Sequence, residues 1–129
     1  MSAQHSGMSP ERWAQYPLEQ QILMIGNEMN RAGKLVGPQD GDSRRRSYER
    51  VLALADLTIQ TNRRPGLQRE LLRWREWAGQ LYVGPAADPS LHAALFRVLL
   101  LFTATSAVQT RVLPGLSFPR DRAPEPASA

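Results

Sequence analysis

Apolar side chains recur at alternating steps of four and three residues between Pro17 and Lys34, and this spacing constrains the fold more than any other feature. Such steps place residues on one side of an α-helix. Gly33 marks its end. Gly26, in its middle, costs about 0.5–1 kcal/mol relative to alanine, a cost that a close neighbouring backbone would offset. The residues that form the stripe are Leu18, Ile22, Ile25, Met29 and Ala32.

Three further segments show helical apolar spacing, and turns rich in Gly, Pro and polar residues separate them. We expect Asp42 or Ser43 to cap the second helix, and Asp88, followed by Pro89, to cap the fourth. The fourth is apolar on nearly every side, which places it centrally in the fold or against another chain. Short connections favour antiparallel neighbours, so the sequence predicts an all-α four-helix bundle. The second, third and fourth predicted helices span residues 44–60, 67–82 and 89–110.

The two ends of the chain differ from its middle. Residues 1–12 are small, polar and interrupted by Gly and Pro, and residues 113–129 are rich in Pro. We therefore predict a flexible N-terminus, a helical domain over residues 13–112 and a disordered C-terminal tail. Trp13 and Tyr16 are expected to fold back on the first turns of the first helix.

The location of the protein is predicted from three features. The chain has no cysteine, which fits a reducing compartment, and its first ten residues lack the pattern of a signal peptide. The fourth helix contains Arg97 and a Thr/Ser-rich end, and its apolar run is shorter than the roughly 20 residues of a membrane span. We therefore expect a cytoplasmic protein without a membrane segment.

Two stretches carry a resemblance to known proteins. NEMNRA in the first predicted helix and YERVLALADLTI in the second resemble segments of small all-helical bacterial proteins whose function is uncharacterised. The resemblance covers about residues 13–82 and contains no catalytic motif. It implies an all-helical bacterial protein and implies no activity.

A group of charged and amide side chains borders the apolar stripes of the first three helices. Glu28 and Asp56 are each placed where partial burial is expected, and a buried carboxylate is costly without an arginine or a hydroxyl beside it. The group forms either structural ion pairs or a shared polar pocket, because both arrangements cluster ionisable residues. The candidate residues are Asn27, Glu28, Arg31, Asp56, Glu70 and Arg73.

Arginine dominates the basic residues. The net charge is +4, and Lys34 is the single lysine among 16 basic residues. A basic chain is compatible with nucleic acid as a partner. The candidate contacts lie at opposite ends of the second helix, which argues against one continuous patch, and a run of the SRRRS type is typical of a solvated face. These candidate contacts are Arg44, Arg45, Arg46, Arg63 and Arg64.

Several chemistries lack the residues that they need. With His5 and His92 as the only histidines and no cysteine, neither a zinc site nor a carboxylate-bridged di-metal site is supported. Glu28 and Leu35 stand where a phosphate loop requires a glycine and a hydroxyl. No Gly-x-Ser-x-Gly elbow occurs. We therefore predict no metal and no cofactor, and we expect His92 at the surface or rim of the bundle.

The leading functional hypothesis is a non-enzymatic protein–protein interaction or self-association module. It predicts a homodimer, or a complex with another protein. The contact buries part of the fourth helix or a second apolar edge of the third helix, formed by Leu72 and Trp77. The reason is that apolar surface exceeds what one bundle needs. One alternative is a nucleic-acid-associated regulatory protein that uses the arginine clusters. A second is an enzyme or small-molecule binder that uses the polar cluster between the first three helices.

Overall fold

The computed structural model describes residues 8–108, with side chains described to residue 103. Every regular element in this range is helical, so the predicted all-α four-helix bundle is confirmed. The predicted helices correspond to α2, α3, α4 and α5, whereas the predicted tail, residues 113–129, lies outside the described range. The elements are α1 (Pro10–Trp13), α2 (Leu18–Gly33), the 3-10 helix η2 (Pro38–Asp40), α3 (Gly41–Thr61), α4 (Pro65–Val83) and α5 (Pro89–Val108).

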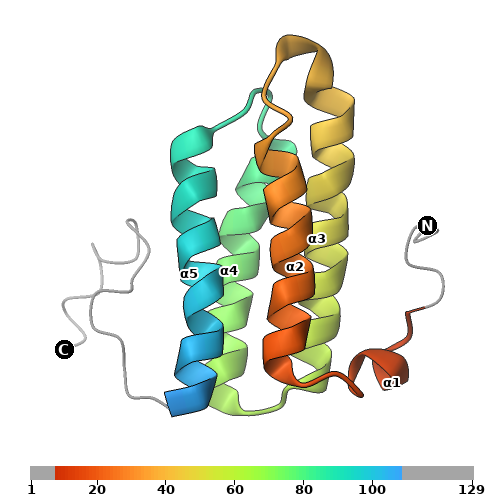
Figure 1. Cartoon of the computed structure of the whole chain (residues 1–129), viewed down its shortest axis with the longest axis vertical. Helices are drawn as coiled ribbons and strands as arrows, with labels where there is room; N and C mark the ends of the chain where they lie inside the picture. The colour runs from red at the N-terminus through yellow and green to blue at the C-terminus, as the bar shows by residue number, and fades with distance from the viewer. Residues whose placement is uncertain (1–7, 109–129) are drawn as a thin grey trace.

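The four long helices pack side by side, and neighbours in the bundle run in opposite directions (Figure 1). α2 packs between α3 and α5, and α4 contacts the same two helices, so α3 and α5 are diagonal partners. The α2–α3 and α4–α5 connections lie at the upper end of the bundle as drawn in Figure 1. The α3–α4 connection and α1 lie at the lower end.

The buried side of each helix forms one core between the four. In α2, Ile22, Ile25 and Met29 are at most 1% exposed, as the spacing predicts. Gly26 was expected to face a neighbouring backbone, and it does not. A Cβ at this position would instead meet the side chain of Phe96 at 3.6 Å, an ordinary contact, so side chains of α5 fill the space beside the glycine.

The lower end of the core is closed by the N-terminal segment. Trp13 is fully buried, and its Nε1 donates a hydrogen bond to the Thr58 hydroxyl on α3 at 3.0 Å. The Gln21 side-chain amide donates to the carbonyls of Trp13 and Tyr16. Trp13 thus meets the first turn of α2 through its carbonyl, as expected, whereas its indole is bonded to α3, which was not expected. It lies in the short helix α1, whose four residues are too few to show a periodic pattern in the sequence.

The two predicted caps have opposite outcomes. Asp88 caps α5, because its Oδ1 accepts a hydrogen bond from the Leu91 N–H at 3.1 Å. The prediction that Asp42 or Ser43 caps the next helix is wrong, since α3 begins at Gly41 and both residues lie within its first turn. The 3-10 helix η2 leads directly into α3, and no extended residue remains at these positions to serve as a cap. None of the described helices is long and apolar enough to cross a membrane.

Candidate functional site

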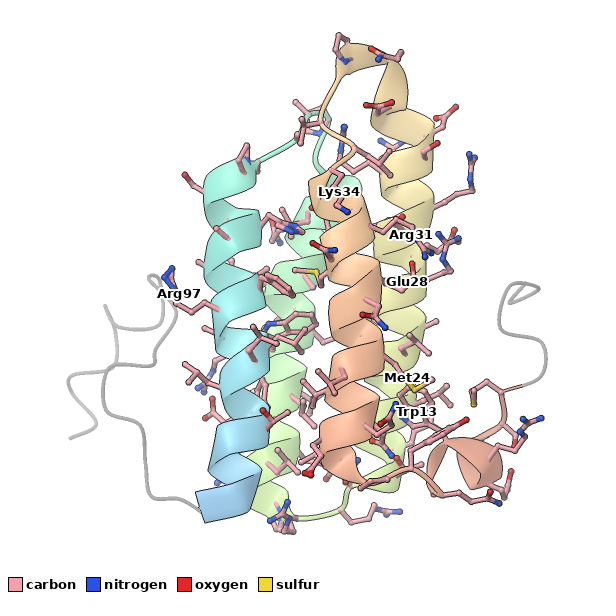
Figure 2. The ribbon with its side chains drawn as sticks, in the orientation of Figure 1. Trp13, Met24, Glu28, Arg31, Lys34 and Arg97 are labelled. Carbon is pink, nitrogen blue, oxygen red and sulfur yellow. The ribbon has the colours of Figure 1, made fainter. Side chains whose placement is uncertain are left out.

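Glu28 lies between two arginines at the interface of α2 and α3. Its carboxylate accepts hydrogen bonds from Arg50 on α3 at 3.0 Å and from Arg31, one turn further along α2, at 3.2 Å. The Glu28 side chain is 16% exposed, and its partners Arg50 and Arg31 are 22% and 58% exposed. Figure 2 shows Glu28 and Arg31 on the side of α2 that borders α3. The expectation that Glu28 meets an arginine is therefore confirmed.

Asp56 pairs with a different helix. Arg75 on α4 donates two hydrogen bonds to its carboxylate, at 2.7 and 3.1 Å. These bonds raise the pKa of the Arg75 guanidinium above its ordinary value. The Asp56 side chain is 46% exposed, so it is less buried than the sequence suggests, and a pair this exposed contributes about 0.2–1 kcal/mol.

The remaining members of the predicted polar cluster lie apart from these two carboxylates. Glu70 and Arg73 form an exposed ion pair within one turn of α4, at 3.3 Å, and Asn27 is exposed on α2. The six residues are thus divided among the α2–α3 interface, the α3–α4 interface and the surfaces of α2 and α4. This division supports the structural ion pairs over the shared pocket.

Sequence reasoning missed Arg50 and Arg75, the arginines that pair with Glu28 and Asp56 across the helix interfaces. Arg75 and Arg73 are two residues apart, which places them on opposite sides of α4. Arg75 shares its side with Gln68, which donates to a carbonyl of α3 at 2.8 Å, so this side faces α3. Residues seven apart lie on the same side of a helix, two turns from each other, so the step from Gln68 to Arg75 is the sequence signal that groups these two positions.

The candidate nucleic-acid contacts do not lie on one surface. Arg44 is 8% exposed, and its guanidinium donates to the Leu35 carbonyl at 3.0 Å. Arg44 therefore closes the α2–α3 connection and is not presented to a partner. Arg45 and Arg46 are exposed at the upper end, whereas Arg63 and Arg64 are exposed in the α3–α4 connection at the lower end.

Tyr48 and His92 share a hydrogen bond across the diagonal of the bundle at its upper end. The Tyr48 hydroxyl lies 2.8 Å from Nδ1 of His92. Burial raises the pKa of the Tyr48 phenol to about 12, while Arg44 lowers it and Asp88 raises it by charge, so the phenol is neutral at physiological pH. The His92 ring covers Gly33, where a Cβ would lie 2.7 Å from Nε2. His92 is half-buried at the rim, as predicted, but its bond to α3 was not foreseen.

Acid is expected to weaken the bundle through His92. Burial lowers the pKa of this imidazole below its ordinary value of 6.5, so the unfolded chain binds a proton at a higher pH than the native protein. The unfolding free energy should therefore fall as the pH drops through 6.5 and stop falling from this cause below the native pKa.

Urea denaturation followed by circular dichroism between about pH 7.5 and pH 5 measures this loss. The control is His92→Gln, which keeps a polar side chain for Tyr48 but does not titrate. The unfolding free energy of the variant should lack the fall that protonation of His92 causes between about pH 7.5 and pH 5. Identical pH profiles for the two proteins would exclude His92 as its source.

No cluster suited to a metal ion occurs among the described residues: no three or more His, Asp or Glu side chains in this range come together. No protein-family model matches the chain, and comparisons with curated proteins and with solved structures give no match either. Over the residues that the structure describes, the molecule is thus a small helical bundle.

Proposed function

We propose that this protein is a non-enzymatic interaction module that self-associates as a homodimer. The observation that carries the proposal is the apolar outer side of α5. Arg97 is the only Arg, Lys, Asp or Glu between residues 89 and 108. Leu100 is 42% exposed, and Phe96 and Val98, which pack against the core, remain partly exposed. A helix on the surface of a bundle normally presents a charged outer side, so another protein is expected to cover this one.

The positions of the charged residues give less support to the two other functions. A nucleic-acid contact would use arginines on one face, but Arg44 is buried, and Arg45 and Arg63 lie at opposite ends of the bundle. A catalytic pocket would need the polar cluster to converge. Its carboxylates Glu28 and Asp56 instead pair with arginines at two different helix interfaces.

Self-association is tested by size-exclusion chromatography with light scattering over a range of protein concentrations. We expect a mass that rises toward about twice the 14.5 kDa of one chain as the concentration increases through the micromolar range. A mass of one chain at every concentration would contradict the proposal. Binding of a fluorescent DNA or RNA duplex that weakens as salt is added would favour the nucleic-acid function instead.

A further inference from the structure

Two exposed leucines lie on α2 and α5, neighbouring helices that share one outer face of the bundle. Leu23 is 51% exposed and Leu100 is 42% exposed. Leu23 precedes Gly26 by one turn, and a Cβ at Gly26 would lie 3.6 Å from Phe96. Leu100 follows Phe96 by one turn of α5. Because α2 and α5 run in opposite directions, these steps bring Leu23 and Leu100 to about the same height.

Charges of opposite sign flank this apolar centre on opposite sides. Glu19 precedes Leu23 by four residues and lies roughly 6 Å toward the lower end, whereas Arg97 lies roughly 5 Å from Leu100 toward the upper end. Both side chains are exposed, and neither forms an ion pair within the described range. Figure 2 shows Arg97 projecting from α5 away from the other helices.

A surface with this arrangement is complementary to itself. In a two-fold dimer the same patch meets itself, so a residue on one side of its centre faces a residue from the other side in the second copy. We infer that the α2–α5 face, defined by Glu19, Leu23, Arg97 and Leu100, binds the same face of a second copy of this chain. The leucines pack at the centre, and each Arg97 pairs with the partner subunit's Glu19. This inference rests on the self-association proposed above.

Charge reversal gives the sharpest experiment. Glu19→Arg alone or Arg97→Glu alone makes the facing charges alike in a homodimer, and each should weaken self-association at least tenfold. An equal mixture of the two variants restores opposite charges at both contacts, so it should form heterodimers about as strongly as the unmodified chain self-associates. Native mass spectrometry, with one variant carrying a tag of distinct mass, identifies the heterodimer.

The chain offers a matched control for the apolar centre. Leu72 on α4 is 52% exposed, almost the same as Leu23, but lies on the helix diagonal to α2. Leu23→Ser should weaken self-association at least tenfold, whereas Leu72→Ser should leave it unchanged. Thermal melting followed by circular dichroism checks that both variants stay folded, which is expected because both positions are half-exposed.

The outcomes separate this inference from the proposed function. An unmodified chain that is monomeric at all concentrations overturns both. A second outcome is a dimer of the unmodified chain that Leu23→Ser does not weaken and that the mixed charge-reversal variants do not form. That result overturns the α2–α5 face and leaves self-association standing. A dimer weakened by Leu72→Ser and not by Leu23→Ser assigns the interface to α4 and likewise overturns the inference.

Discussion

Replacing Trp13 by alanine is expected to lower the free energy of unfolding by about 3–5 kcal/mol. The side chain is fully buried at the lower end of the core, and its indole N–H is bonded to Thr58. Its removal leaves a cavity beneath α1 and takes away a hydrogen bond between residues distant in the sequence. A domain of this size has a total stability of about 5–15 kcal/mol, so the loss is a large fraction of the whole. Urea denaturation followed by circular dichroism measures it.

Two further variants separate the contributions at Trp13. Tyr16→Ala removes a partly exposed ring that packs edge-on against Trp13 with ring centroids 5.8 Å apart, and should cost clearly less. Trp13→Phe keeps an aromatic ring but deletes the N–H donor. The Thr58 hydroxyl still donates to the Leu54 carbonyl, so this variant should also cost less than alanine. A loss below about 1 kcal/mol for Trp13→Ala would show that α1 is not part of the cooperative core.

The second large effect is expected at Trp74, where alanine should also cost about 3–5 kcal/mol. Trp74 is 1% exposed on α4, and its Nε1 donates to the Leu95 carbonyl on α5 at 2.9 Å. The substitution removes this bond as well as packing volume between the two helices. The denaturation midpoint in urea, together with the slope of the transition, gives the change in stability.

Trp77, one turn further along α4, provides the comparison. Trp77 is only partly buried against the core, so Trp77→Ala should cost markedly less than Trp74→Ala. Equal losses at the two positions would mean that α4 is rotated about its axis relative to the arrangement described here. The pair of variants therefore tests which side of α4 faces the core.

Periodicity predicts the four long helices because each stripe is contained within one segment of the chain. Ile22, Ile25 and Met29 show their common side without reference to any other helix. The start of α3 differs from the prediction because η2 continues directly into α3 at Gly41, whereas capping preferences alone favour a later start. There, Arg44 reaches back to the Leu35 carbonyl in the preceding connection, and this contact between segments is not visible in the local sequence.

The polar contacts are harder to predict, because they depend on how each helix is rotated about its axis. The sequence predicts an arginine or a hydroxyl beside Asp56 but does not identify it, and the side of α4 that faces α3 carries Arg75. The exposed apolar face is hidden for a related reason. Leu23 lies outside the stripe of α2, and α5 is apolar on so many sides that no polar side reveals which way Leu100 points.

Two of the bonds that join distant parts of the chain have a consequence for how the bundle opens. Trp13–Thr58 spans 45 residues and Tyr48–His92 spans 44, and they lie at opposite ends of the molecule. Helices in isolation fray from their termini, and backbone amides there exchange with solvent through small local openings. Here α3 is bonded to other helices at Tyr48 and at Thr58, so exchange of the amides between these two residues is expected to require separation of helices rather than fraying of one.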